Sequence, residues 1–76
     1  MTWNHRVVRF EDDEMGEYFE IKEVFYKEDG SLSGYSEATI LADTFEGLHE
    51  QMDMFRAAIS KPVIKEHEFF LPKDPT

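Results

Sequence analysis

The clearest hydrophobic pattern in the chain lies in residues 43–62. Apolar side chains recur there at steps of three and four, which places them on one stripe of an α-helix. The stripe consists of Phe45, Leu48, Met52, Phe55 and Ile59. Asp43 or Thr44 can cap the first free N–H groups of this helix, and Pro62 marks the end of the helix. The pattern predicts an amphipathic helix whose stripe packs against another part of the chain.

The first half of the chain has strand-like patterns instead. Three runs are rich in β-branched and aromatic residues: residues 4–10, 17–27 and 32–42. An acidic stretch closed by Gly16 separates the first two runs, and Asp29-Gly30 between the second and third is a strong hairpin signal. We therefore predict an α+β fold, a three-stranded antiparallel meander with the helix on one face (β-β-β-α) and an extended C-terminal segment.

Two details of the strands stay open at this level. Strict alternation places Glu23 on an otherwise apolar face. Either Glu23 lies at an edge of the sheet, or a β-bulge near Glu23 moves Val24 and Tyr26 to the core side. Gly34 is expected at a bulge or weak point of the third strand. Whether residues 63–71 form a further strand is also undecided.

Size and composition exclude several classes of protein. A chain of 76 residues makes one domain, which we assign to residues 1–71, with residues 72–76 as a disordered tail. The chain has no cysteine, which excludes disulfides and thiolate metal sites and fits a cytoplasmic protein. No apolar run approaches the roughly 20 residues of a membrane span, so membrane insertion is not expected.

The charge is strongly acidic, with seventeen acidic and eight basic residues and a net charge of −9. Because nucleic-acid affinity depends on clustered Lys and Arg, direct nucleic-acid binding is not expected. An acidic balance either keeps the protein soluble through self-repulsion, or indicates a basic partner or mimicry of nucleic-acid charge. The densest acidic run should be a solvated, mobile loop: Glu11, Asp12, Asp13 and Glu14.

Motifs for catalysis or metal binding are incomplete. The chain has no cysteine nucleophile, no G-x-S-x-G and no glycine-rich phosphate loop. Glu46 and His49 share a helical face, but di-metal bundles need further carboxylates from facing helices. The segment that begins at Asp29 resembles the first half of a calcium loop, yet Ile40 stands where a bidentate glutamate is required. We predict a non-enzymatic protein without catalytic residues, metal or cofactor.

The sheet face that one helix leaves open is the better candidate for function. Aromatic side chains on such a face form an interface for a protein partner or for a second copy. The candidate residues are Tyr18, Tyr26 and Tyr35, interleaved with Glu20 and Glu37. The alternative is that residues 69–71 fold back over part of this face. Both possibilities stay open.

The chain resembles a family of small uncharacterised bacterial proteins that open MxWNYRV, continue to HEVYYDxDG and end near KPVL. The corresponding segments are residues 1–7 (MTWNHRV), 22–30 (KEVFYKEDG) and 61–64 (KPVI). Gly47 departs from the second glutamate at the family's helix start. This resemblance implies no particular activity.

More distantly, three strands followed by Thr44-x-Glu46-x-Leu48 are similar to the HicB-like antitoxin domain. That architecture implies a small basic RNase toxin as the partner. We therefore expect an acidic interaction module that binds a basic protein or dimerises. The alternative is a phage-type acidic inhibitor whose carboxylates replace phosphates in binding a nucleic-acid-binding defence protein.

Overall fold

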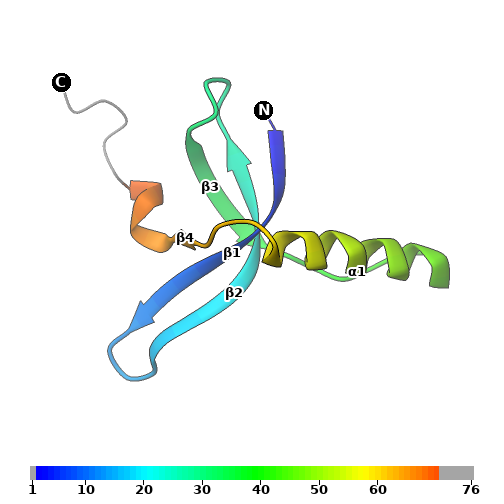
Figure 1. Ribbon diagram of the computed structural model, residues 1–76, viewed down its shortest axis with the longest axis horizontal. Coiled ribbons are helices and arrows are strands. Elements are labelled where there is room, and N and C mark those ends of the chain that lie inside the picture. The colour runs from blue at the N-terminus through cyan, green and yellow to red at the C-terminus, as the bar shows by residue number, and fades with distance from the viewer. Residues whose placement is uncertain (1, 71–76) are drawn as a thin grey trace.

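The computed structural model describes residues 2–70, which form a four-stranded mixed sheet with one long helix (Figure 1). The elements in chain order are β1 (Thr2–Asp12), β2 (Gly16–Tyr26), β3 (Leu32–Glu37), α1 (Phe45–Ile59), β4 (Ile64–Lys65) and the 3-10 helix η1 (Glu66–Phe70). The sheet order is β3-β2-β1-β4, with β1, β2 and β3 antiparallel and β4 parallel to β1. The predicted α+β class and the meander are confirmed. The strand within residues 63–71 is limited to β4.

Both turns of the meander are shaped by an aspartate and a glycine. Asp12 Oδ1 accepts hydrogen bonds from the backbone N–H groups of Glu14 (2.7 Å) and Met15 (3.0 Å), and Gly16 has φ of +81°. At the predicted Asp29-Gly30 hairpin, Gly30 has φ of +87°. L side chains rarely adopt such angles, so glycine suits both positions.

The pairing of β1 with β2 is continuous from Thr2 opposite Tyr26 to Asp12 opposite Gly16. Strict alternation therefore holds along β2: Glu23 lies neither at an edge of the sheet nor at a bulge, but Val24 and Tyr26 do lie on the core side, as the second alternative expected. The register shift lies between Phe25 and Tyr26 in the pairing with β3, and β2 is a central strand. Glu23 remains half-buried, and its Oε1 accepts a hydrogen bond from Ser36 Oγ on β3 at 3.4 Å.

Alternation divides the sheet into two faces, because residues directly opposite each other share a side. The tyrosine face carries Val8, Phe10, Tyr18, Glu20, Lys22, Val24, Tyr26, Tyr35, Glu37 and Ile64. The helix face carries Trp3, His5, Val7, Arg9, Phe19, Ile21, Glu23 and Phe25.

The main core lies on the tyrosine face. Its buried residues are Val8, Phe10, Val24 and Ile64, with Tyr18, Tyr26, Leu32, Tyr35 and Phe69 packed against them. η1 brings the Phe69 ring to 4.9 Å from the Tyr35 ring. Of the two possibilities for this face, the fold-back of the C-terminal segment is therefore found at Phe69. Phe70 is exposed, and residues 71–76, including the predicted tail, lie outside the described residues.

α1 begins at its predicted cap but packs less than predicted. Thr44 Oγ1 accepts a hydrogen bond from the Gly47 N–H at 2.9 Å, so Thr44 rather than Asp43 is the N-cap. The C-terminal end contacts the helix face, where Ala58 is fully buried and the Phe55 ring lies 4.7 Å from the His5 ring.

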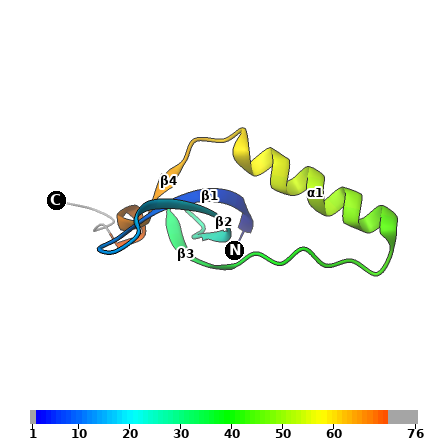
Figure 2. The same cartoon turned by 90° about the horizontal axis from the view of Figure 1, so that it is seen from below.

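The expectation that all five stripe residues pack against the sheet is wrong for three of them. Phe45, Met52 and Ile59 are 75%, 49% and 67% exposed. The reason is that β3 ends at Glu37, so residues 38–42 are not part of the strand as predicted. Figure 2 shows that this segment continues past the sheet and carries the start of α1 away from it.

Candidate functional site

The tyrosines predicted to bind a partner make contacts within the domain. Tyr26 Oη donates to Asn4 Oδ1 at 2.8 Å and accepts from Arg6 Nη1 at 3.0 Å. Tyr35 Oη donates to Glu66 Oε2 on η1 at 3.1 Å. The Tyr18 ring stacks on Phe10 with 5.3 Å between centroids. These three side chains are half-buried and are committed to holding the sheet and η1 together.

The two carboxylates predicted beside those tyrosines neutralise a buried lysine. Lys22 is 6% exposed, and its Nζ lies 2.7 Å from Glu20 Oε1 and 2.8 Å from Glu37 Oε1. The same Nζ lies 5.6 Å from the Phe10 ring centre and 5.9 Å from the Tyr35 ring centre. Hydrogen bonds to Glu20 and then to Glu37 raise the pKa of Lys22, so this lysine stays charged. Glu20 and Glu37 therefore stabilise the fold by pairing with Lys22.

Sequence reasoning missed Lys22 as a structural centre, although a signal was present. It is the only basic residue within β2, and it alternates with Glu20 on one face. Its burial could not be predicted without the position of β3, which brings Glu37 opposite Lys22. Tyr35 lies beside it, and burial followed by its hydrogen bond to Glu66 raises the pKa of the Tyr35 hydroxyl.

The helix face, in contrast, is largely open. A groove of about 300 Å³ is lined by Val7, Phe19, Glu20, Ile21 and Ile59. Phe19 is 54% exposed at this groove. Ile59 connects the groove to the exposed side of α1. The exposed residues Met52 and Phe45 follow Ile59 along α1 at steps of seven residues.

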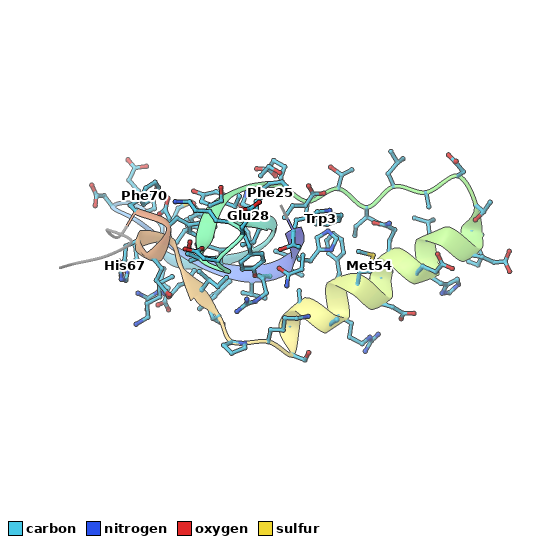
Figure 3. The ribbon with its side chains drawn as sticks, turned by 90° about the horizontal axis from the view of Figure 1, so that it is seen from above. Trp3, Phe25, Glu28, Met54, His67 and Phe70 are labelled. Atoms are coloured by element: carbon cyan, nitrogen blue, oxygen red, sulfur yellow. The ribbon has the colours of Figure 1, made fainter. Side chains whose placement is uncertain are left out.

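A second hollow lies at the junction of the sheet and α1. It has about 200 Å³ and is lined by Trp3, Asn4, His5, Met54, Ala57 and Lys61. Figure 3 shows Trp3 and Met54 near this junction. His5 is buried between the Trp3 ring (5.4 Å) and the Phe55 ring (4.7 Å), and its Nδ1 has no hydrogen-bond partner. His5 was not singled out from the sequence, because only the sheet register places it under the helix.

A third hollow, beside η1, is mixed in charge. It has about 280 Å³ and is lined by Arg9, Glu11, Lys65, Glu66, His67 and Phe70. Arg9 Nη1 lies 2.9 Å from Glu17 Oε2, so part of the positive charge there is already paired. Within residues 2–70, no group of three or more His, Cys, Asp or Glu side chains is arranged to hold a metal ion.

The acidic residues are spread over several extremities of the molecule. The predicted acidic loop is at the β1–β2 end, where Glu11 and Asp12 belong to β1 and Asp13 and Glu14 to the turn. All four are exposed. Hydrogen bonds from the backbone N–H groups of Met15 and Glu14 lower the pKa of Asp12.

Further acids lie at the β2–β3 turn and on α1, at Glu28, Asp29, Glu46, Glu50 and Asp53. Figure 1 shows that these elements point in different directions from the loop at residues 11–14. The carboxylates therefore do not form one continuous stripe.

Comparison of the chain with protein-family models, with curated proteins and with solved structures finds no match. Within residues 2–70, no helix is both long and apolar enough to span a membrane. The case for a function therefore depends on the surface that the fold presents.

Proposed function

We propose that this chain is a non-enzymatic protein-interaction module that binds a partner protein through the groove of the helix face. The observation that carries the proposal is the open apolar groove formed by Val7, Phe19, Ile21 and Ile59. The tyrosine face is closed by the chain's own β4 and η1, whereas nothing within residues 2–70 fills this groove. Apolar cores with aromatic anchors are typical of protein interfaces.

The charge of the chain indicates the kind of partner. Glu17 and Glu23 share the helix face with the groove residues. With a net charge of −9, the chain attracts basic proteins and repels acidic ones. A small basic protein with an exposed apolar side chain fits this surface best, as a toxin would fit a HicB-like antitoxin in the cytoplasm.

A second candidate function is acidic inhibition by mimicry of nucleic-acid charge. The exposed residues 11–14 favour it, because four consecutive carboxylates are available to a basic surface. The separation of this loop from the acids of α1 argues against it, since mimicry of a phosphate backbone needs a continuous stripe of charge.

One experiment separates the two candidates. The immobilised protein is incubated with a bacterial lysate, and the retained proteins are identified by mass spectrometry at low and high salt. For the module, we expect a basic partner that resists high salt, because apolar contacts are not screened. Phe19→Ser should weaken its retention at least ~10-fold. The matched control is Phe70→Ser, which removes an equally apolar, exposed side chain far along the chain on η1.

The opposite pattern would favour mimicry. In that case retention falls steeply with salt and is reduced by the double change Asp13→Asn and Glu14→Gln, while Phe19→Ser has little effect. A protein that retains no partner whose binding depends on Phe19 or on the acidic loop would contradict both candidates.

A further inference from the structure

The exposed side of α1 carries a seven-residue pattern that meets the groove only at Ile59. Phe45, Met52 and Ile59 are spaced by seven residues, so they lie along one line of the helix. They are 75%, 49% and 67% exposed. Leu48 and Phe55, the residues between them in the stripe, are half-buried. The stripe therefore has the a and d spacing of two heptads, with the line of Phe45, Met52 and Ile59 directed to solvent.

We propose that this line pairs with the same line of a second copy of the chain. The two α1 helices run antiparallel about a two-fold axis at Met52, so that Phe45 of each copy meets Ile59 of the other. This rests on the proposed function, because it assigns one occupant to the apolar surface next to the groove. It covers Ile59 at the edge of the groove and leaves Val7, Phe19 and Ile21 for the partner protein.

The charges of α1 set the antiparallel order. Glu46 lies in its first turn and Arg56 in its last turn, and Lys61 follows the helix. Antiparallel pairing puts the acidic first turn of one helix beside the basic end of the other. Parallel pairing would instead place Glu46 beside Glu46 in a chain that already carries a charge of −9.

The exposed apolar area of α1 and of the segment before it indicates how stable the dimer should be. The exposed apolar residues on this line and in the segment before it are Ile40, Leu41, Phe45, Met52 and Ile59. Together they expose on the order of 500 Å², if a complete side chain has roughly 150–200 Å². This is below the low end of specific interfaces, about 600 Å² per partner. The dimer should therefore be reversible and dependent on concentration.

Cysteine cross-linking tests the arrangement directly, because the chain has no cysteine of its own. Met52→Cys should form disulfide-linked dimers under mild oxidation, since the two sulfurs meet at the axis. Glu50→Cys, an exposed position on another side of α1, is the matched control and should stay largely monomeric. Phe45→Cys and Ile59→Cys should each fail to cross-link alone and should cross-link when mixed.

Sedimentation of the purified protein gives an independent measurement. The unmodified chain should shift from monomer to dimer as its concentration rises, and Met52→Glu should weaken this dimer at least ~10-fold without loss of helix signal in circular dichroism. Self-cross-linking of Phe45→Cys, or a monomer at all concentrations without Met52→Cys cross-links, would overturn the proposal. A monomeric chain that still retains a Phe19-dependent partner would overturn only the dimer and not the proposed function.

Discussion

The two faces of the sheet differ in how well the chain covers them. On the tyrosine face, Val8 and Val24 are completely buried under contributions from β4 and η1. On the helix face, Phe19 remains 54% exposed, although the longest helix of the chain lies on that side. A five-residue 3-10 helix therefore covers its face better than a fifteen-residue α-helix covers the other.

The difference comes from how each cover is attached. β4 pairs with β1, and η1 follows β4 directly, so Phe69 packs against the core. The Tyr35–Glu66 hydrogen bond holds η1 in this position. α1 follows the unpaired residues 38–44, which carry its start beyond the sheet (Figure 2). Core packing is thereby concentrated on the tyrosine face, and the interaction that we propose is on the helix face.

The largest expected effect is at Phe10 in the core of the tyrosine face. Phe10→Ala should lower the free energy of unfolding by about 3–5 kcal/mol, because it leaves a cavity beneath Tyr18 and Tyr35. Phe19→Ala on the helix face should cost about 1 kcal/mol or less, since that side chain is half exposed. Urea unfolding followed by circular dichroism measures both.

Phe10→Leu keeps the comparison measurable if Phe10→Ala does not fold. It should cost less than Phe10→Ala and still more than Phe19→Ala. Equal costs for Phe10→Leu and Phe19→Ala would mean that the helix face is as important for stability as the tyrosine face.

Local signals in the sequence were enough to predict the fold class. The Asp29-Gly30 turn, the Thr44 cap and the stripe of α1 each act over a few residues, so they could be read without knowing the rest of the structure. The end of β3 could not be read in this way. Residues 38–42 have an extended pattern whether or not they pair with β2, and pairing depends on partners distant in sequence.

The candidate site was harder to predict for the same reason. The sequence indicated that the tyrosines lie on the face opposite the helix, and β-strand alternation places them there. It raised the return of residues 69–71 over this face but could not decide for it, because Phe69 follows Tyr35 by more than thirty residues. Nor could it show that residues 38–44 leave the line of Phe45, Met52 and Ile59 in solvent.

A smaller effect on the free energy of unfolding is expected at Lys22. Two substitutions there distinguish the contribution of packing from that of charge on the tyrosine face. Lys22→Ala should cost about 2 kcal/mol, because the aliphatic stem fills space between Phe10 and Tyr35. Lys22→Met keeps most of that volume. It should change stability by about 1 kcal/mol or less, because Glu20 and Glu37 are exposed enough to be hydrated when unpaired. Urea unfolding at neutral pH distinguishes the two variants, and a Lys22→Met as costly as Lys22→Ala would show that the ion pairs dominate.

The smallest effect at neutral pH is expected at the Tyr35 hydroxyl, which joins the sheet to η1. Tyr35→Phe removes its hydrogen bond to Glu66 and should cost about 0.5–1.5 kcal/mol at pH 7. Burial raises the pKa of Tyr35 above its usual value of 10.0, so the folded state keeps the proton after the unfolded state has lost it. Stability from this group is therefore complete below pH 10.0 and is lost as the pH rises through the folded pKa.

Lys22 acts in the same direction, because hydrogen bonds to Glu20 and Glu37 raise its pKa above 10.5. The free energy of unfolding of the unmodified chain should consequently fall above about pH 10, and Tyr35→Phe should reduce this fall. Combining Tyr35→Phe with Lys22→Met should reduce it further, because both groups belong to the tyrosine face. Urea titrations from about pH 8 to about pH 11 measure these slopes. If the double variant loses stability as steeply as the unmodified chain, the alkaline sensitivity does not originate from Lys22 and Tyr35.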